Sequence, residues 1–412
     1  MHATHRRSLI VICVILATLV GPAAAQGYQT PGFGVDWTLD DLVANSGGAV
    51  LGGAGQYTVT AEVIIAATDR LAIAPGTTVT FVDNPDVGLT VAGILEAVGT
   101  ADARIVFTGA NPVPGSWRGL DFGDTVASSA FRLEHCEVAY ADEAIDTFEG
   151  DIELRHCEVR DSLGKAIDIT AADGLVSNCH LHHNRARTIT MTLTASPTIE
   201  DCLLEDNNLD NSSPYPYLNI GLQGVNSPTI TGNHIIGSGN HMSGGIAVWN
   251  ASNATIEGNI IEGCGYGILC YQTGASPVIT GNQIRDNNIH PDTVNWGFGV
   301  ACNGNNAPIL MDNRITGHWY GVAAINGGRP NLGDLVNDFP GDDGGNQIEL
   351  NGLGSQTYGF YNNTPLAQMA QGNWWGAADA AGVEDAIFHQ VDDPGLGLVQ
   401  QGSQLFRLPG LL

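Results

Sequence analysis

The chain has 412 residues, with 43 acidic against 15 basic side chains and a formal net charge of −28. A protein this acidic has no broad basic surface, which excludes binding along the backbone of DNA or RNA. The hydrophobic fraction of 43% excludes a disordered chain, and 54 glycines with only 14% charged residues favour a β-rich protein over a helical one.

The first 25 residues have the features of a secretory signal peptide. Arg6 and Arg7 precede an apolar run at residues 9–20, and Ala23 and Ala25 frame a small-residue cleavage site. No later stretch of 18 residues is apolar, so we expect no membrane span in the mature chain. We therefore expect the mature protein to be secreted to the cell exterior or to the periplasm.

Residues 26–60 are expected to form an N-terminal cap. The segment TLDDLVA at residues 38–44 has the pattern of a short helix, which Gly47 and Gly48 would end. A cover is needed there because the next part of the chain is predicted to be a solenoid, whose open end would expose a sheet edge and core.

Residues 61–376 are dominated by internal repeats. SPTITGNHI at 227–235 resembles NATIEGNII at 253–261 and SPVITGNQI at 276–284. One shared position, here called the anchor column, falls at Cys136, Cys157, Cys179, Cys202, Asn233, Asn259, Asn282 and Asn313. Successive anchors lie 21 to 31 residues apart, which is typical of one small unit stacked many times.

The unit is predicted to consist of short strands. No segment keeps a period of 3.6 residues, which excludes helical repeats, and the leucine spacing of leucine-rich repeats is missing. A parallel β-helix with three strands per coil remains. A second column begins a strand in many coils and is expected to point inward: Ile145, Ile167, Ile246, Ile268, Val300 and Val322.

The anchor column also accounts for most of the cysteines. Stacked asparagine amides there are expected to bond one another and the turn backbone. A cysteine at such an inward position behaves as a small apolar residue, so we expect buried free thiols. Disulfides between adjacent coils stay open as an alternative, because a coil spacing of ~4.8 Å lies within the range that disulfides tolerate.

Residues 377–412 are expected to form a C-terminal cap and tail. The motif GNWWG at 372–376 leads into residues 377–388, which we expect to form a helix over the last coil. The tail ends with LFRLP at 405–409.

Several motifs resemble those of bacterial right-handed parallel β-helix repeat proteins of the pectate-lyase-like superfamily. The resemblance covers residues 35 to 400 and is carried by APGTTVTF at 74–81, LTVAGILEA at 89–97, IVFT at 105–108, GSWRGLDF at 115–122 and the closing GNWWG. It implies an all-β fold, a single-stranded right-handed parallel β-helix with short helical caps. Members of this group include lyases, hydrolases, epimerases and non-catalytic surface proteins, so the resemblance does not define the chemistry.

The resemblance suggests one candidate catalytic cluster. The acid hydrolases of the group use a Gly-His-Gly element that this chain lacks, whereas the lyases use Ca²⁺ and a basic residue that removes a proton. An interval of about 22 residues would align the only lysine, Lys165, with Arg187, and Asp146 with Asp168. The lyase hypothesis therefore makes Lys165 or Arg187 the base and Asp146 and Asp168 the calcium ligands; an ordinary solvated ladder of ion pairs is the alternative.

Aromatic residues on the central coils form a second candidate site. Trp249, Tyr271, Trp296 and Trp319 are predicted to stack against sugar rings. Two long excursions, at 208–218 and 287–296, lie near them, and long loops on a solenoid often line its binding face. Such an acidic protein repels polyuronates unless calcium bridges them, so neutral glycans fit equally well. Loop packing against the solenoid wall is the alternative.

Histidines also gather in the sequence, at 135, 156, 180, 182 and 183. A transition-metal site is one interpretation, and exposed turn histidines are the other.

Together these patterns predict a secreted, monomeric β-helix that recognises glycans or other envelope components, or serves as a rigid structural element, without catalysis. The alternative is a calcium-dependent polyuronate lyase. The leading hypothesis requires no cofactor, and the lyase alternative requires calcium.

Overall fold

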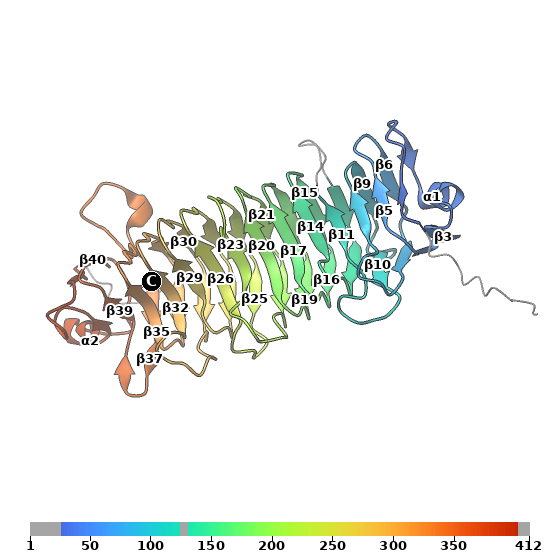
Figure 1. Cartoon of the computed structure of the whole chain (residues 1–412). Helices are drawn as coiled ribbons and strands as arrows, with labels where there is room; N and C mark the ends of the chain where they lie inside the picture. The colour runs from blue at the N-terminus through green and yellow to red at the C-terminus, as the bar shows by residue number, and fades with distance from the viewer. Residues whose placement is uncertain (1–25, 124–130, 403–412) are drawn as a thin grey trace, which may run out of the picture.

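The computed structural model describes residues 26–123 and 131–402, and three long sheets run through most of that length (Figure 1). The predicted signal peptide at 1–25 and the tail motif at 405–409 lie outside the described residues. The chain visits the three sheets in turn, coil after coil, so the molecule is an elongated solenoid.

Sheet A forms one face of the solenoid. It has 14 strands within the described residues, and each strand is parallel to its neighbours. Its strands are β1 (Tyr28–Gln29), β5 (Val63–Ile65), β8 (Leu89–Val91), β11 (Leu120–Phe122), β14 (Ile145–Phe148), β17 (Lys165–Thr170), β20 (Arg187–Thr192), β23 (Pro216–Ile220), β26 (Gly244–Trp249), β29 (Ile268–Tyr271), β32 (Phe298–Asn303), β35 (Tyr320–Ile325), β39 (Phe360–Asn363) and β41 (Ile387–Phe388).

Sheets B and C form the other two faces. The strands of sheet B are β2 (Asp36–Trp37), β6 (Arg70–Ile73), β9 (Ile94–Val98), β12 (Phe131–Glu134), β15 (Ile152–Arg155), β18 (Gly174–Ser177), β21 (Thr198–Glu200), β24 (Thr229–Thr231), β27 (Thr255–Glu257), β30 (Val278–Thr280) and β33 (Ile309–Met311). Those of sheet C are β3 (Val50–Gly53), β4 (Gln56–Val59), β7 (Thr78–Phe81), β10 (Ile105–Gly109), β13 (Cys136–Ala139), β16 (Glu158–Arg160), β19 (His180–His182), β22 (Leu203–Glu205), β25 (His234–Ile236), β28 (Ile260–Glu262), β31 (Gln283–Arg285), β34 (Arg314–Thr316) and β36 (Gln347–Glu349). Only β3 and β4 pair antiparallel within these two sheets as described.

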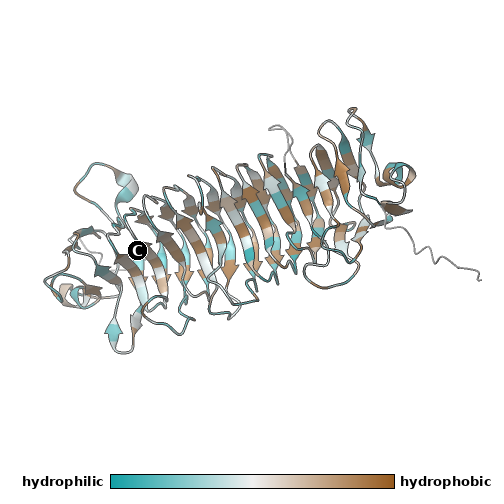
Figure 2. Ribbon diagram, in the orientation of Figure 1, coloured by the Kyte–Doolittle hydropathy of each residue, from teal (hydrophilic) through white to brown (hydrophobic). Residues whose placement is uncertain are grey.

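Residues of one kind stack in register through the interior. Ile145 pairs with Ile167, and Ile167 pairs with Ile189, on neighbouring strands of sheet A. Because successive side chains of a strand point to opposite faces, these isoleucines all enter the core while the residues after them face outward. One apolar core therefore runs along the solenoid, and brown and teal alternate along the ribbon in Figure 2. The predicted three-strand parallel coil is confirmed.

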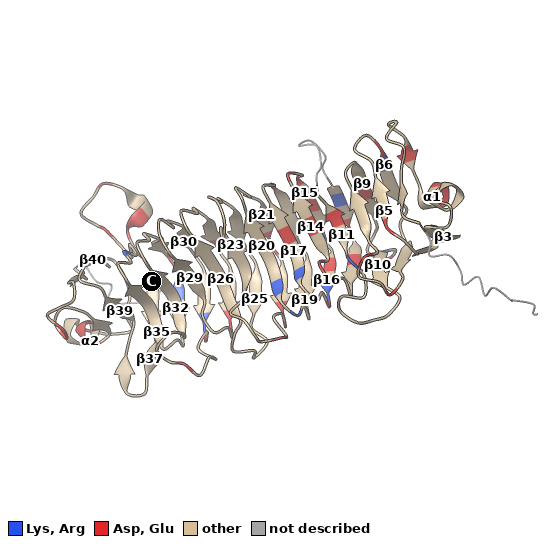
Figure 3. Ribbon diagram, viewed as in Figure 1, with Lys and Arg blue, Asp and Glu red and all other residues tan. Residues whose placement is uncertain are grey.

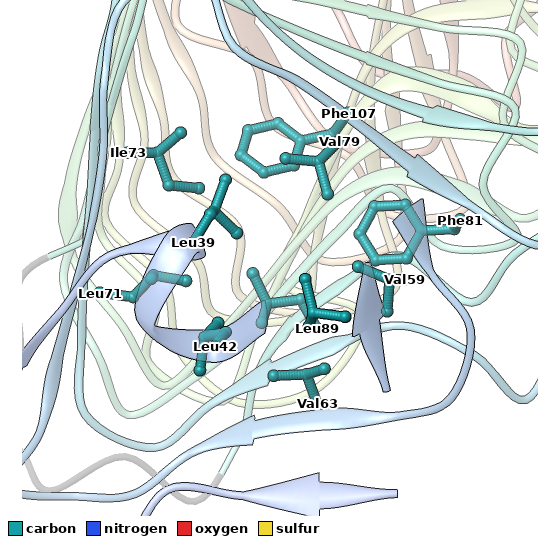
Figure 4. Close-up of a pocket in the computed structure, with 11 residues that line it drawn as sticks. Leu39, Leu42, Val59, Val63, Leu71, Ile73, Val79, Phe81, Leu89 and Phe107 are labelled. Atoms are coloured by element: carbon teal, nitrogen blue, oxygen red, sulfur yellow. The ribbon is translucent and has the colours of Figure 1, made fainter. Parts of the chain in front are cut away.

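A short helix closes the N-terminal end of this core. Helix α1 spans Leu39–Asn45, and Thr38 caps it in a reciprocal arrangement with Asp41. Leu39 and Leu42 are buried and line a small apolar pocket at the end of the core (Figure 4). The helix that the sequence predicts at 38–44 is present, one residue further along the chain.

The C-terminal end is less helical than the sequence predicts. Helix α2 spans only Ala380–Glu384, and the expected helix over 377–388 is therefore wrong in length. Ile387 and Phe388 instead form β41, which pairs with β39 and continues sheet A. The remaining elements near this end are η1 (Pro340–Asp342), β37 (Gly352–Leu353), β38 (Gln356–Thr357), β40 (Gln368–Met369) and β42 (Val399–Gln400).

The anchor column is a continuous hydrogen-bonded ladder. The side-chain Nδ2 of Asn259 donates to Oδ1 of Asn282 at 3.0 Å, and Nδ2 of Asn282 donates to Oδ1 of Asn313 at 2.9 Å. The ladder extends beyond the predicted members to Asn346 and Asn373 by the same bonds. Each amide is buried but satisfied, which is the condition for placing a polar group in a core.

The residue just before each anchor lies in a turn, and the conformation of that turn explains the glycines and histidines found there. Gly232, Gly258 and Gly281 have φ near +65°, a left-handed conformation that glycine adopts without strain. In earlier coils His135 and His156 hold this position, with φ of 49° and 53°. The histidine column is thus placed by the turn geometry of successive coils.

The seven cysteines of the described chain are free and buried. Four of them continue the asparagine ladder toward the N-terminus, where the backbone N–H of Cys202 donates to Oδ1 of Asn233 at 3.0 Å. Cys270 and Cys302 pair in register on sheet A. The expectation of buried thiols is confirmed.

A second buried ladder of side chains includes Asn287, His318 and Asn351. His318 takes the place of an asparagine in it. Nδ1 of His318 accepts the backbone N–H of Asn287 at 3.2 Å, and its Nε2 lies 3.0 Å from the carbonyl oxygen of Ile284. The backbone N–H of His318 in turn donates to Oδ1 of Asn351 at 3.0 Å. Burial lowers the pKa of His318 to about 4, so the ring is neutral at pH 7.

We predict that His318 makes the fold sensitive to acid. An unfolded histidine binds a proton near pH 6.5, whereas the folded ring resists it down to about pH 4, so stability is lost as pH falls through this window. In His318→Asn the side-chain amide can still accept the backbone N–H of Asn287 and donate to the carbonyl oxygen of Ile284, and it does not titrate. Between pH 7 and pH 4 the variant should lose about 2–3 kcal/mol less stability than the wild type, measured by urea denaturation. Parallel losses in both proteins would contradict this.

Candidate functional site

The outward face of sheet A carries one continuous register row, here called the outer row. Its members pair strand by strand and lie between core residues of the same strands: Thr90, Asp121, Asp146, Asp168, Thr190, Asn219, Ala247, Leu269, Ala301, Ala323, Tyr361 and Phe388. The row is polar in its first half and apolar or aromatic in its second half. Figure 3 shows the same division, with charged residues on β11, β14 and β17 and little charge from β26 onward.

The predicted catalytic and metal residues do come together in the polar half. Asp146 and Asp168 are direct neighbours in the outer row, and Lys165 and Arg187 are paired on β17 and β20. Lys165 donates a hydrogen bond to Oδ2 of Asp168, and its Nζ lies 3.5 Å from Oε1 of Glu143. The register deduced from the repeat interval is therefore confirmed.

Lys165 is held in its charged form. Burial by itself would lower the pKa of this amine, but the hydrogen bond and negative charge of Asp168 outweigh it, and the pKa is raised. A lyase base must lose its proton near the operating pH. The arrangement therefore opposes the role of base that the sequence assigns to Lys165.

Arg187 is committed to a different contact. Its guanidinium carbon lies 4.9 Å from the centre of the Tyr215 ring, a cation–π geometry. Tyr215 belongs to the excursion at 208–218, so Arg187 helps to fix that loop over the polar half of the sheet.

Asp146 differs from its neighbour in the row. Burial first, and the nearby charge of Asp168 second, raise the pKa of Asp146 to about 6. A cavity of about 180 Å³ lies beside it, lined also by Asp121, Asp142 and Glu143. Arg118 borders the same cavity, with its charge directed to Glu62 at 2.9 Å.

Three successive rungs of the outer row bury polar atoms that have no hydrogen-bond partner among the described residues. They are Oδ1 of Asp168, Oγ1 of Thr190 and Oδ1 of Asn219, and each of these residues is less than 10% exposed. The interval of about 22 residues also aligns Thr190 with Asp168, but neither Thr190 nor Asn219 was assigned a role from the sequence. The sequence does contain a signal for these residues, because in consecutive strands each of them stands between two apolar residues.

The predicted metal site is incomplete. The described part of the chain contains no group of three or more His, Cys, Asp or Glu side chains placed to hold a metal ion. Asp146 and Asp168 offer two carboxylates, one of which is bonded to Lys165, whereas Ca²⁺ takes six to eight oxygen ligands. The residues present therefore do not fit a resident calcium ion by themselves.

The histidines gather in two groups, His135 with His156 and His182 with both His180 and His183, but within the described residues neither group is placed to hold a metal ion. His135 and His156 stack with ring centres 4.8 Å apart, and His180 and His182 stack at 4.1 Å. His180 bonds Glu205, and His182 bonds Glu158, each at 2.9 Å. These contacts form ladders of outward-facing side chains on sheet C and on the turn next to it.

The aromatic half of the row supports a groove. A cavity of about 380 Å³ is lined by Trp249, Tyr271 and Trp296, three of the four predicted sugar-binding residues. An adjoining cavity of about 200 Å³ shares four lining residues with it, namely Asn295, Phe298, Asn303 and Ile325. We call the two cavities together the aromatic groove. Trp319 lines neither cavity and lies against Gly297.

The floor and one wall of the aromatic groove are packed against other side chains. Phe298, Ala301 and Ala323 form a buried apolar cluster on the outer side of sheet A, separate from the main core. Trp296, from the excursion at 287–296, stacks on His290 with ring centres 4.2 Å apart and lies 5.6 Å from Tyr266. Aromatic side chains held in this way offer a preformed surface to a ligand.

Comparisons with known proteins agree with the architecture. A family model described as "Right handed beta helix region" matches residues 212–334. Among solved structures, a double mutant of the periplasmic alginate epimerase AlgG is 13% identical and aligns over 90% of this chain and 84% of its own, with a TM-score of 0.42. Pectate lyase Pel9A is 12% identical over 83% of this chain and 71% of its own, with a TM-score of 0.30. A search of curated proteins found no match.

The three stacked sheets make the fold of the chain a parallel β-helix, and residues 212–334 match the right-handed form of it.

We predict that Asp146 weakens the fold at high pH. Its pKa of about 6 lies above the ordinary value of 3.8, so stability falls as pH rises from about 4 to above 6. Asp146→Asn removes the buried charge. At pH 8 the variant should be more stable than the wild type by about 1 kcal/mol, after allowance for partial exposure, and the difference should vanish near pH 4. Thermal melting at both pH values measures this, and a difference independent of pH would contradict it.

Proposed function

We propose that this chain is an exported β-helix module that binds glycans in the aromatic groove without catalysing a reaction. The observation that carries the proposal is the convergence of Trp249, Tyr271 and Trp296 on one cavity of the outer face. Aromatic rings bury large apolar areas, and a sugar ring offers an apolar face to them. A surface of this kind on a rigid scaffold is typical of a binding site.

The lining of the aromatic groove favours binding over chemistry. None of the described residues that line it is Asp, Glu, His, Lys, Arg or Cys. General acid–base and nucleophilic catalysis both rely mainly on these side chains. The groove thus has residues for contact and orientation, and among its described lining residues only the tyrosines, Tyr266, Tyr271, Tyr320 and Tyr361, could transfer a proton.

We propose that residues 1–25 direct export and are then removed, residues 26–60 cap the solenoid, residues 61–376 form the β-helix and residues 377–412 close it. No helix of the described residues is long and apolar enough to cross a membrane. The function belongs to the cell envelope or the exterior, where glycans are abundant.

We predict that removing one aromatic wall weakens glycan binding. Trp249→Ala and Trp296→Ala should each weaken binding of the best glycan on an array by about tenfold or more, because central aromatic contacts are worth ~2 kcal/mol. Calorimetry measures the affinity. Phe33→Ala is the matched control, since Phe33 is 83% exposed and lies in the N-terminal cap. Absence of binding to every glycan, or wild-type affinity in both tryptophan variants, would refute the proposal.

The second candidate is a calcium-dependent polyuronate lyase in the polar half. The adjacent carboxylates of Asp146 and Asp168 favour it, together with the cavity beside Asp146. In this mechanism Lys165 or Arg187 would take the proton, and substrate carboxylates would have to complete the calcium ligands. The charged state of Lys165 weighs against it.

The lyase hypothesis predicts unsaturated uronate products, seen as rising ultraviolet absorbance, that require calcium and disappear in Lys165→Ala. Arg187→Ala is the companion variant, because only the substitution that removes the actual base should abolish product formation. If a panel of polyuronates yields no product with or without calcium, the lyase hypothesis is wrong. Activity retained in Lys165→Ala would exclude Lys165 as the base, and activity retained in Arg187→Ala would exclude Arg187.

A further inference from the structure

We infer that the ligand of the aromatic groove is an uncharged oligosaccharide of several units that lies along the solenoid axis. This inference rests on the proposed glycan-binding function and adds to it the charge, length and direction of the ligand.

The length and direction follow from one register row. Trp249, Tyr271, Asn303, Ile325 and Asn363 are paired in this order on β26, β29, β32, β35 and β39, and all five line the aromatic groove. Four strand spacings of ~4.8 Å give a span of about 19 Å along the axis. A single sugar would fill only part of this length, whereas an oligosaccharide would contact every coil.

The polar side chains of the groove indicate that the ligand is uncharged. Among the described residues the lining contributes four amides, those of Asn295, Asn303, Asn326 and Asn363. An amide both donates and accepts hydrogen bonds, as a sugar hydroxyl does. Recognition of a carboxylate instead favours Arg or Lys, and neither type is among these lining residues.

The charges near the groove oppose an acidic ligand. Asn295 donates from Nδ2 to Oδ2 of Asp292 at 2.8 Å, and this hydrogen bond keeps the pKa of Asp292 below its usual range. A fixed negative charge therefore adjoins the wall formed by the excursion at 287–296. The net charge of the whole chain, −28, repels polyanions over a longer range.

The groove also has a defined N-terminal limit. The outer row changes from Asn219 on β23 to Ala247 on β26, and acidic members of the row begin at Asp168, three strands before Ala247. Pro214 borders the groove on this side, next to Tyr215, which stacks with Arg187. The ligand is thus confined to the C-terminal half of sheet A.

The test is calorimetry on the full mature chain with hexasaccharides of two kinds. The neutral probes are cellohexaose, mannohexaose and xylohexaose, and the acidic probes are the hexamers of galacturonate and mannuronate. At least one neutral hexamer should bind about tenfold more tightly than either acidic hexamer, with little change between low and high salt. Its disaccharide should bind about tenfold more weakly than the hexamer, because it leaves part of the groove empty.

Two variants test the span. Trp249 and Tyr361 lie near opposite ends of the groove, so Trp249→Ala and Tyr361→Ala should each weaken hexamer binding about tenfold, while Phe33→Ala leaves it unchanged. Thermal melting confirms that each variant is folded. An effect of only one of the two would overturn the inferred length.

The outcomes separate this inference from the proposed function. If an acidic hexamer binds as tightly as the neutral ones and still depends on Trp249, the groove binds glycans but the inferred charge is wrong. If the disaccharide binds as tightly as the hexamer, the inferred length is wrong. If no hexamer binds, the proposed function itself fails and this inference fails with it.

Discussion

The hydrogen bonding of each coil to the coils before and after it is the constraint on which the rest of this structure depends. Parallel pairing fixes the direction of every side chain, because a shift of one residue would exchange the core face and the outer face. The ladder of Asn259, Asn282 and Asn313 reinforces this register from within, since each buried amide is satisfied only when its neighbours are aligned. The positions of functional residues on the outside therefore follow from polar contacts on the inside.

The parallel register of the strands thus produces two different surfaces on a single sheet. In the first half of the outer row, neighbouring rungs bring carboxylates together, and the resulting repulsion and burial are visible in the raised pKa of Asp146. In the second half the same spacing places Leu269, Ala301, Ala323 and Tyr361 on consecutive strands and leaves an apolar floor. The excursion that carries Trp296 then adds a wall, because a loop can lengthen without disturbing the stacked strands beneath it.

The sequence predicted the parts of the fold that repeat. The spacing of the anchors was enough to place Asp146 beside Asp168 and Lys165 beside Arg187. It did not find Asn346 and Asn373, which lie 33 and 27 residues after the preceding anchors, because within the described residues the long sheet B ends at β33 and none of its strands stands just before them. The helix expected at 377–388 was too long for a related reason: Ile387 pairs with Phe360, and a distant strand decides its conformation.

The candidate sites were predictable only in part, because they depend on where loops return to the sheet. Trp249 and Tyr271 lie on strands, and their register follows from the repeat. Trp296 and Trp319 lie beyond strand ends, and the sequence alone could not show that the first faces the groove while the second lies against Gly297. The protonation of Lys165 likewise depends on a contact with Asp168 that the register permits but does not require.

The N-terminal cap has a consequence for how the molecule behaves among its own copies. A parallel solenoid has no intrinsic end, since the coil that pairs with the last strand can equally come from another molecule. Helix α1, only seven residues long, occupies that position with Leu39 and Leu42 over the exposed end of the core. Two turns of helix thereby cover the apolar end of the core, on which a coil of another molecule could otherwise stack.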